Sequence, residues 1–160
     1  MINDGARVWI YQSNRVFNNK ELDSLNQILN DFTQTWTAHN QQLKAGFEIE
    51  YNRFIILNVD EQQAGASGCS IDKSVHLIQE IEKQFNVNLF DRFHIAWKEN
   101  ENIISGNRDE FEHQIKIGNI NQETIVFNNL VSNYAQLRTN WEIPLKHSWH
   151  SKVFKLESVL

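Results

Sequence analysis

The amino-acid sequence predicts a mixed α+β protein, and the pattern of its first hundred residues carries this prediction. Four short runs rich in β-branched and aromatic residues are typical of strands: 7–12, 44–51, 54–59 and 93–97. Apolar residues recur at helical spacing over residues 18–38 and 70–84. The resulting order is strand, helix, strand, strand, helix, strand. We expect it to form an antiparallel sheet with both helices on one face.

The first strand and the first helix each have a clear local signature. Residues 7–12 are apolar on both faces, which is typical of a strand in the centre of a sheet. Asn18 is a good N-cap, and Glu21 stands three residues later, as in a capping box. The sequence therefore predicts a helix that begins after Asn18 and continues to about Ala38.

The next two strands are predicted to form a hairpin. Residues 44–51 alternate between apolar and polar, which indicates one face in contact with water. Residues 54–59 are almost continuously apolar, and Asn52-Arg53 makes a tight connection between the two runs. We expect the second strand of this hairpin to be the more buried.

This order of elements is the βαββαβ, or ferredoxin-like, arrangement. We expect residues 1–160 to form a single domain, with a ferredoxin-like core at 1–99 and an extension at 100–160. The extension is less regular. Its expected elements are a short strand at Ile103-Ile104, a helix at 109–117 stopped by Gly118, a strand at 124–127 and a short helix at 133–141.

The composition excludes several classes of function. A net charge of −5, with both signs interspersed, provides no basic surface, so we expect no nucleic-acid partner. No run of residues approaches the roughly 20 apolar residues that span a bilayer, and no signal peptide is evident. The single cysteine fits a reducing compartment. We therefore expect a cytoplasmic protein without a membrane association.

A loop of small residues between the third strand and the second helix is the first candidate site. In the predicted fold we expect the first and third strands to be parallel neighbours, which would place their following loops together. The two helix N-termini would then face the same edge, where backbone N–H groups favour an anion. The predicted ligand-binding residues at this edge are Ser13, Asn14, Arg15, Ser67, Gly68, Cys69, Ser70 and Lys73.

Two interpretations of this edge remain open. It is either a site for a small anion or the carboxylate of a peptide, or an ordinary solvated connection with routine helix caps. Lys73-Ser74 resembles the end of a phosphate-binding loop, but Ser67 and Asp72 stand where that loop needs glycine. We therefore expect no P-loop ATPase activity and no nucleotide cofactor.

The chain offers few candidates for catalysis. Cys69 could be a thiolate activated by a helix N-terminus, with His76 as its base. In a helix the two residues stand about two turns apart, so the alternative is a small buried structural cysteine. His147 and His150 lie three residues apart without a nearby cysteine or carboxylate at a recognisable ligand spacing, so no metal site is predicted.

The C-terminal tail supports a third hypothesis, a protein-interaction subunit. After Trp149 the tail carries five apolar residues: Val153, Phe154, Leu156, Val159 and Leu160. These must pack on the domain or on a second chain, and a self-complementary contact would give a homodimer. The leading hypothesis remains a non-catalytic binding or regulatory module, and a thiol enzyme and an interaction subunit are its alternatives.

Several segments resemble a family of short cytoplasmic proteins from Bacteroidota whose members are often labelled ABC transporter ATPases. The segments are RVWIYQSNR at 7–15, YNRFIIL at 51–57, GCSIDKSVH at 68–76, IVFNNLV at 125–131 and SWH at 148–150. The resemblance implies no established activity and assigns no catalytic residue. The sequence has no Walker A loop and no signature motif of that ATPase class.

Overall fold

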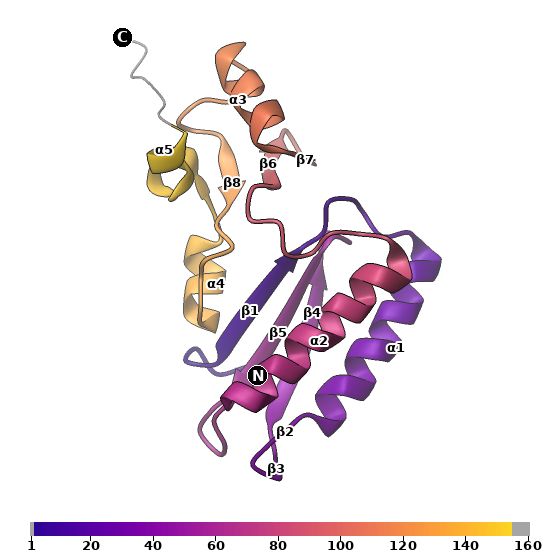
Figure 1. The fold of residues 1–160 in the computed structure, drawn as a ribbon. Coiled ribbons are helices and arrows are strands. Elements are labelled where there is room, and N and C mark those ends of the chain that lie inside the picture. The colour runs from indigo at the N-terminus through magenta and orange to yellow at the C-terminus, as the bar shows by residue number, and fades with distance from the viewer. Residues whose placement is uncertain (1, 155–160) are drawn as a thin grey trace.

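The computed structural model describes residues 2–154 and has an α+β fold, as predicted (Figure 1). The first part of the chain contains β1 (Arg7–Gln12), α1 (Asn19–Thr35), β2 (Thr37–Ala38), β3 (Gln41–Gln42), β4 (Lys44–Glu50), β5 (Phe54–Asp60) and α2 (Gly68–Phe85). The second part contains β6 (Ile95–Glu99), β7 (Asn102–Gly106), α3 (Arg108–Lys116), β8 (Ile125–Phe127), α4 (Tyr134–Asn140), β9 (Glu142–Pro144), a 3-10 turn (Leu145–His147) and α5 (His150–Val153).

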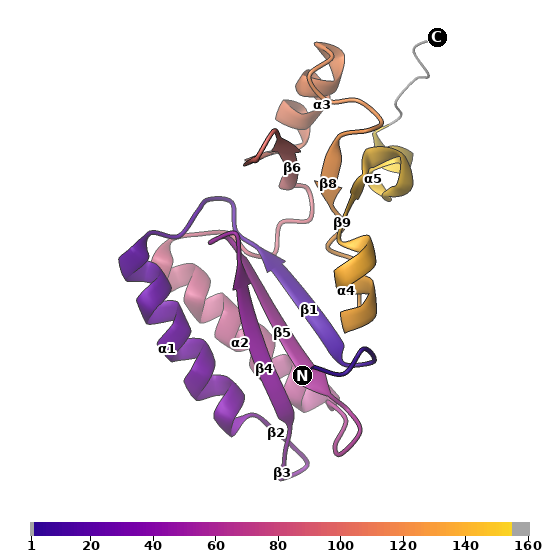
Figure 2. The same ribbon diagram turned by 180° about the vertical axis from the view of Figure 1, so that it is seen from behind.

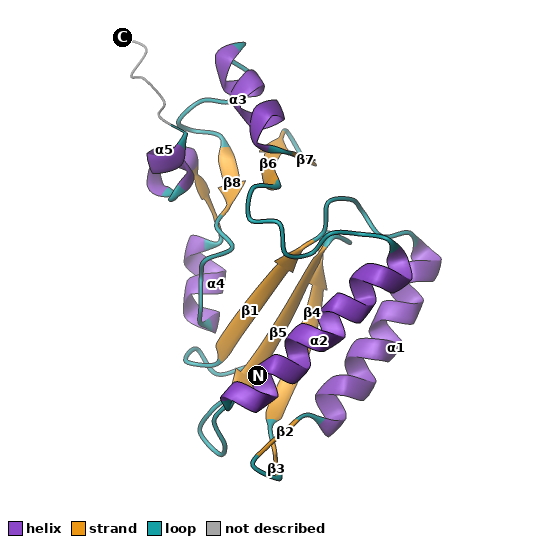
Figure 3. Ribbon diagram, in the orientation of Figure 1, coloured by secondary structure: helices purple, strands orange, loops and turns teal. Residues whose placement is uncertain are grey.

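Three strands form the first sheet, in the order β1-β5-β4, with every pair antiparallel (Figure 3). The predicted hairpin between β4 and β5 is confirmed. Its turn places Tyr51 and Asn52 in the left-handed region, with φ of 53° and 54°, and Asn tolerates that conformation better than most residues do. Because β5 lies between two strands, it is the most buried strand, as its apolar run predicted.

The two long helices lie side by side across one face of this sheet (Figure 1). Asn18 and Glu21 form the predicted capping box at the start of α1. Alternate residues of β1 and β5 point toward the helices and build the larger core, which includes Tyr11, Ile55, Leu57, Leu25, Leu29, Ile78 and Ile81. Helix α1 ends at Thr35, three residues earlier than predicted, because residues 37–42 turn back as the short hairpin β2–β3.

The predicted fourth strand does not join this sheet, so the ferredoxin-like prediction is wrong on that point. β6 belongs to a second antiparallel sheet, in the order β7-β6-β8-β9. It pairs with β7 through a tight turn at Asn100, which has a φ of 57°. Closing so short a hairpin costs far less chain entropy than pairing β6 with the distant β1. The pairing of β6 with β8 gives it a second neighbour within the extension.

The edge of β1 that the fourth strand would have covered is closed by a loop. Val8 N donates a hydrogen bond to Ser132 O at 3.0 Å, and Arg7 forms a single β-bridge with Asn133. Helix α4 follows directly and runs beside β1 (Figure 2). The apolar run in β1 predicted a central strand. Instead, β1 is last in the sheet order, and both of its faces are covered by other elements.

Helix α4, the segments on either side of it, and residues of β6 and β8 pack against the face of the first sheet that α1 and α2 leave free. This interface contains Val8, Phe54, Ile56, Ala96, Phe127, Val131, Leu137 and Trp141. A further core lies between the second sheet and helices α3 and α5, where Phe154 packs on Phe111 with ring centroids 4.8 Å apart. The described residues contain no helix long and apolar enough to cross a membrane.

Candidate functional site

The predicted anion-binding edge is not assembled, because β1 and β5 are antiparallel rather than parallel. Gln12 at the end of β1 pairs with Phe54 at the start of β5, and Ser13 N donates to Arg53 O at 2.8 Å. The small-residue loop follows the other end of β5. The two halves of the predicted site therefore lie at opposite ends of the first sheet. The error lies in the strand direction, since the split βαβ arrangement makes the first and third strands antiparallel neighbours.

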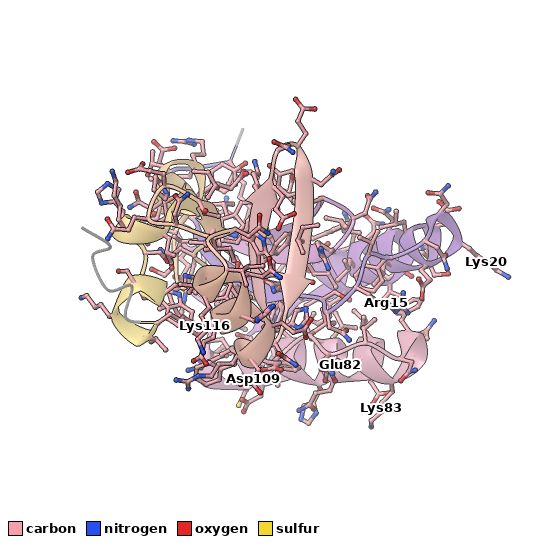
Figure 4. The ribbon with its side chains drawn as sticks, turned by 90° about the horizontal axis from the view of Figure 1, so that it is seen from above. Arg15, Lys20, Glu82, Lys83, Asp109 and Lys116 are labelled. Carbon is pink, nitrogen blue, oxygen red and sulfur yellow. The ribbon has the colours of Figure 1, made fainter. Side chains whose placement is uncertain are left out.

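Arg15 stabilises helix termini instead of offering a free charge. Its guanidinium forms two parallel hydrogen bonds of 2.8 Å with the Glu21 carboxylate and donates a further bond to Phe85 O, at the end of α2. Figure 4 shows Arg15 between the start of α1 and the end of α2, where Glu82 and Lys83 lie. The 18 residues of α2 span roughly 27 Å at 1.5 Å per residue, so Arg15 is far from Gly68.

Ser13 and Asn14 have local structural roles. The Ser13 hydroxyl accepts a hydrogen bond from Arg15 N at 3.2 Å. Asn14 and Asn88 bond reciprocally, with Asn14 N donating to Asn88 O at 3.2 Å and Asn88 N donating to Asn14 Oδ1 at 2.9 Å. These bonds tie the end of β1 to the segment that follows α2.

The serines of the small-residue loop cap the start of α2. Ser67 Oγ accepts from Ser70 N at 3.1 Å, and Ser70 Oγ accepts from Ser67 N at 2.7 Å, which completes a reciprocal capping box. Gly68 and Lys73 are exposed, and a Cβ added at Gly68 would meet nothing within 4 Å. The arrangement matches the alternative interpretation of this loop, an ordinary strand-to-helix connection.

The predicted thiol site is not formed. Cys69 is exposed in the first turn of α2, which also corrects the alternative of a buried cysteine. His76 is exposed on the same helix, and seven residues at about 1.5 Å each place it roughly 10 Å further along the axis. Among residues 2–154 no group of three or more His, Cys, Asp or Glu side chains could hold a metal ion.

The structure contains a different candidate site, a cavity of about 500 Å³ between the end of β1 and the second sheet. We call it the inter-sheet cavity. Three connections close it: the segment that enters β6, the segment after β8, and the start of α5. Its walls are mainly apolar and aromatic. The lining residues are Ile10, Tyr11, Gln12, Leu89, Phe90, Asp91, Arg92, Phe93, His94, Phe127, Asn129, Leu130, Trp149 and His150.

A chain of side-chain hydrogen bonds holds the two sheets in place around this cavity. Gln12 Nε2 donates to His94 O at 2.7 Å, while Asn129 Nδ2 donates to Gln12 Oε1 at 2.8 Å. Trp141 Nε1 in turn donates to Asn129 Oδ1 at 2.9 Å. Because Gln12 is buried and bonded from both ends, its position in β1 fixes the loops that carry His94 and Asn129.

Behind His94 lies a buried arginine. Arg53 is 5% exposed, and its Nη2 donates to Ser105 Oγ at 2.7 Å, while His94 Nε2 lies 2.8 Å from the same oxygen. Within residues 2–154 Arg53 forms no ion pair, and its Nε has no hydrogen-bond partner. Burial lowers the pKa of Arg53, and burial together with the Arg53 charge lowers the pKa of His94.

A second histidine lines the inter-sheet cavity at the start of α5. His150 is 2% exposed, its Nδ1 lies 2.6 Å from Ser148 Oγ, and its ring stacks on Trp149 with centroids 3.9 Å apart. Burial lowers the pKa of His150 to about 4, so the ring is neutral at pH 7. The indole Nε1 of Trp149 is buried and has no hydrogen-bond partner among the described residues.

From the sequence, His150 was considered as a metal ligand, and no ligand-binding role was predicted for Gln12, Arg53 or Asn129. One signal was present: Arg53 is a charged residue between two strands that both pack into the core. Comparisons of the chain with protein-family profiles, with curated proteins and with solved structures each found no match. The candidate site is therefore defined by its geometry.

Proposed function

We propose that this protein is a non-catalytic binding or regulatory module that takes a small molecule with an apolar body into the inter-sheet cavity. The observation that carries the proposal is the cavity itself. About 500 Å³ lined by aromatic walls and a few polar side chains is the usual form of a small-molecule site. Phe90, Phe93 and Leu130 remain 41%, 45% and 62% exposed at its border, where a ligand would cover them.

The hydrogen bonding of the two histidines favours binding over hydrolysis. A serine nucleophile needs a neighbouring base that a third group orients. Ser148 is 3% exposed and does not line the cavity, and no carboxylate bonds to His94 or His150 among the described residues. Each imidazole bonds instead to one serine hydroxyl. This arrangement positions the rings but provides no attacking group.

The interaction subunit remains an alternative with less support, and the thiol enzyme loses its support because Cys69 and His76 lie about two turns apart on α2. Phe154 packs on Phe111 of the same chain, so the start of the tail does not need a partner to be buried, while Leu156, Val159 and Leu160 lie outside the described residues. A homodimer through the tail would show as a larger species for the whole chain than for a chain ending at Phe154. The likeness to short Bacteroidota proteins and a cytoplasmic location also stay predictions.

The proposal is tested by screening small apolar compounds against the ¹⁵N-labelled protein by NMR. Binders should shift the amide signals of Tyr11, His94 and Leu130, which line the cavity, and leave those of Gly68 and Cys69 unchanged. The substitution Leu130→Asp places a charge at the border and should weaken binding about tenfold or more, because the ligand would have to desolvate the carboxylate.

A matched control is Ile117→Asp, since Ile117 is exposed to a similar degree, 60%, at the end of α3. That substitution should leave affinity unchanged. Binders that shift only amides outside the inter-sheet cavity, or that tolerate Leu130→Asp as well as Ile117→Asp, would contradict the proposal.

A further inference from the structure

The contacts of Ser105 favour one tautomer of His94. Ser105 Oγ contacts Arg53 Nη2 and His94 Nε2. A guanidinium can only donate, so the serine oxygen accepts from Arg53 and its own hydrogen is available for His94 Nε2. In the tautomer that accepts this hydrogen, the imidazole proton lies on Nδ1. His94 Nδ1 has no hydrogen bond to the described residues and is a free donor in that tautomer.

For His150, the burial of its serine partner favours the opposite tautomer. The only hydrogen-bond partner of Ser148 Oγ among residues 2–154 is His150 Nδ1. The hydroxyl is buried, and donating its hydrogen to Nδ1 satisfies both groups at once. The imidazole proton then lies on Nε2, which has no partner among the described residues. A neutral ring at pH 7 agrees with the lowered pKa of His150.

The indole N–H of Trp149 can only donate a hydrogen bond. Its Nε1 has no partner among the described residues but is fully buried, so Trp149 faces the cavity with its ring and not with this nitrogen. Two amide oxygens of the lining already accept hydrogen bonds: Gln12 Oε1 accepts from Asn129, and Asn129 Oδ1 accepts from Trp141. The unpartnered nitrogens of His94 and His150 are therefore the donors on which a ligand site would depend.

The charges near His94 have both signs, and the largest single one is positive. Arg53 is a buried cation without an ion pair within the described residues, directly behind His94. In the lining, Arg92 is exposed next to Asp91, whose Oδ1 accepts from Phe93 N at 2.9 Å. Arg53 acts on His94 more strongly than either Asp91 or Glu110 does, so an anion held at His94 would gain more from Arg53 than it would lose to either carboxylate.

We propose that the ligand is an apolar, aromatic carboxylic acid whose carboxylate accepts hydrogen bonds from His94 and His150. This inference rests on the proposed function and names its ligand class. A carboxylate matches two donors and one buried cation, and its body would lie against the aromatic walls. A doubly charged phosphate would leave charge uncompensated among those walls.

Three probes of nearly equal shape test the inference: 3-phenylpropanoate, 3-phenylpropanamide and 3-phenylpropylamine. Calorimetry at pH 7, with NMR to locate each probe, should show the acid binding at least tenfold tighter than the amide. The amine should not bind. In the free protein, ¹⁵N NMR of the histidine side chains should show the proton of His94 on Nδ1 and that of His150 on Nε2.

Substitutions identify the donors. His150→Phe keeps an aromatic ring and removes the donor, so the preference for acid over amide should fall several-fold. His147→Phe is the control, because His147 is exposed three residues earlier and does not line the cavity. His94→Phe removes the other donor and is a second variant with the same expected loss, in case His150→Phe does not fold.

The outcomes separate the two proposals. Equal affinity of acid and amide at the cavity, or the opposite histidine tautomers, would overturn the carboxylate inference and leave the binding module standing. Failure of every probe and of the apolar compounds to shift the lining residues would overturn both. An acid that bound only at Gly68 to Ser70 would also overturn the inference.

Discussion

Arg15 shows how one residue can support two different hypotheses until its neighbours are known. From the sequence it was a mobile charge beside a small-residue loop. In the structure it joins Glu21 at the start of α1 to Phe85 O at the end of α2. Both contacts are favourable in the sense of the helix dipole, since a carboxylate lies near an N-terminus and a guanidinium near a C-terminus.

This pair predicts a pH-dependent contribution to stability. Hydrogen bonds from Arg15 and from the backbone at Asn18 lower the pKa of Glu21 to about 2, from an ordinary value of 4.5. Because the folded-state pKa is the lower one, the stabilisation is complete above pH 4.5 and is lost as the pH falls toward 2. The Arg15 side chain is 40% exposed, so solvent screening reduces the contribution to about 1 kcal/mol.

Urea denaturation of the wild type and of Glu21→Gln measures this contribution. The variant should be less stable by about 1 kcal/mol at pH 7, and the difference should disappear near pH 2. Lys83→Gln is the matched control, because the Lys83–Glu80 pair is 76% and 72% exposed and should contribute little at any pH. An equal deficit at pH 7 and pH 2 would mean that Glu21 acts through something other than its charge.

Local signals in the sequence located most of the longer elements. The capping box at Asn18, the hairpin at Asn52 and the helix stop at Gly118 each depend on residues within four positions of one another. The strands β2, β3 and β9 were not predicted, because two or three residues are too short to show a period. They form because they pair with a neighbouring strand: β2 pairs with β3, and β9 pairs with β8.

The two glycines at helix ends should respond oppositely to alanine. Gly68 begins α2 with open space where a Cβ would be, so Gly68→Ala should stabilise the protein by about 0.5 kcal/mol through a less flexible unfolded chain. Gly118 follows α3 with a φ of +80°. Gly118→Ala should therefore cost about 1–2 kcal/mol, because a Cβ disfavours the left-handed region.

Thermal unfolding of both variants checks this pair of predictions. Each glycine serves as the control for the other, since the chemical change is the same and only the backbone conformation differs. A destabilised Gly68→Ala would mean that the small-residue loop needs a bare backbone at that position, and it would revive the loop as a candidate site.

For the whole molecule, the sequence predicted where most of the strands lie, but it did not predict which strands pair with one another. The apolar pattern of 93–97 is compatible with either sheet. Whether this segment joins the first or the second sheet depends on its pairing with β7 and β8, which lie after the first hundred residues. The inter-sheet cavity results from this choice, because its walls come from β1, from the segment before β6, from β8 and from α5. No local motif contains these residues together.

The core of the second sheet predicts a role for the start of the tail. Phe154 is 4% exposed and packs on Phe111, so Phe154→Ala should destabilise the protein by about 3 kcal/mol by leaving a cavity. Val153→Ala is the control, since Val153 is 39% exposed and should cost less than about 1 kcal/mol. Equal losses in urea denaturation would indicate that Phe154 does not belong to this core in solution.

The strand β4 has a consequence for how the protein behaves when concentrated. It is last in its sheet and has one partner, β5, among the described residues, so its other side presents backbone groups that a foreign strand could pair with. The charged side chains of Lys44, Glu48 and Glu50 lie on this edge strand and disfavour such pairing. Burial, together with the charges of Glu48 and Glu142, raises the pKa of Glu50. On acidification Glu50 therefore becomes neutral sooner than an ordinary glutamate, and we expect edge-to-edge aggregation to begin in mildly acidic solution while the fold is still intact.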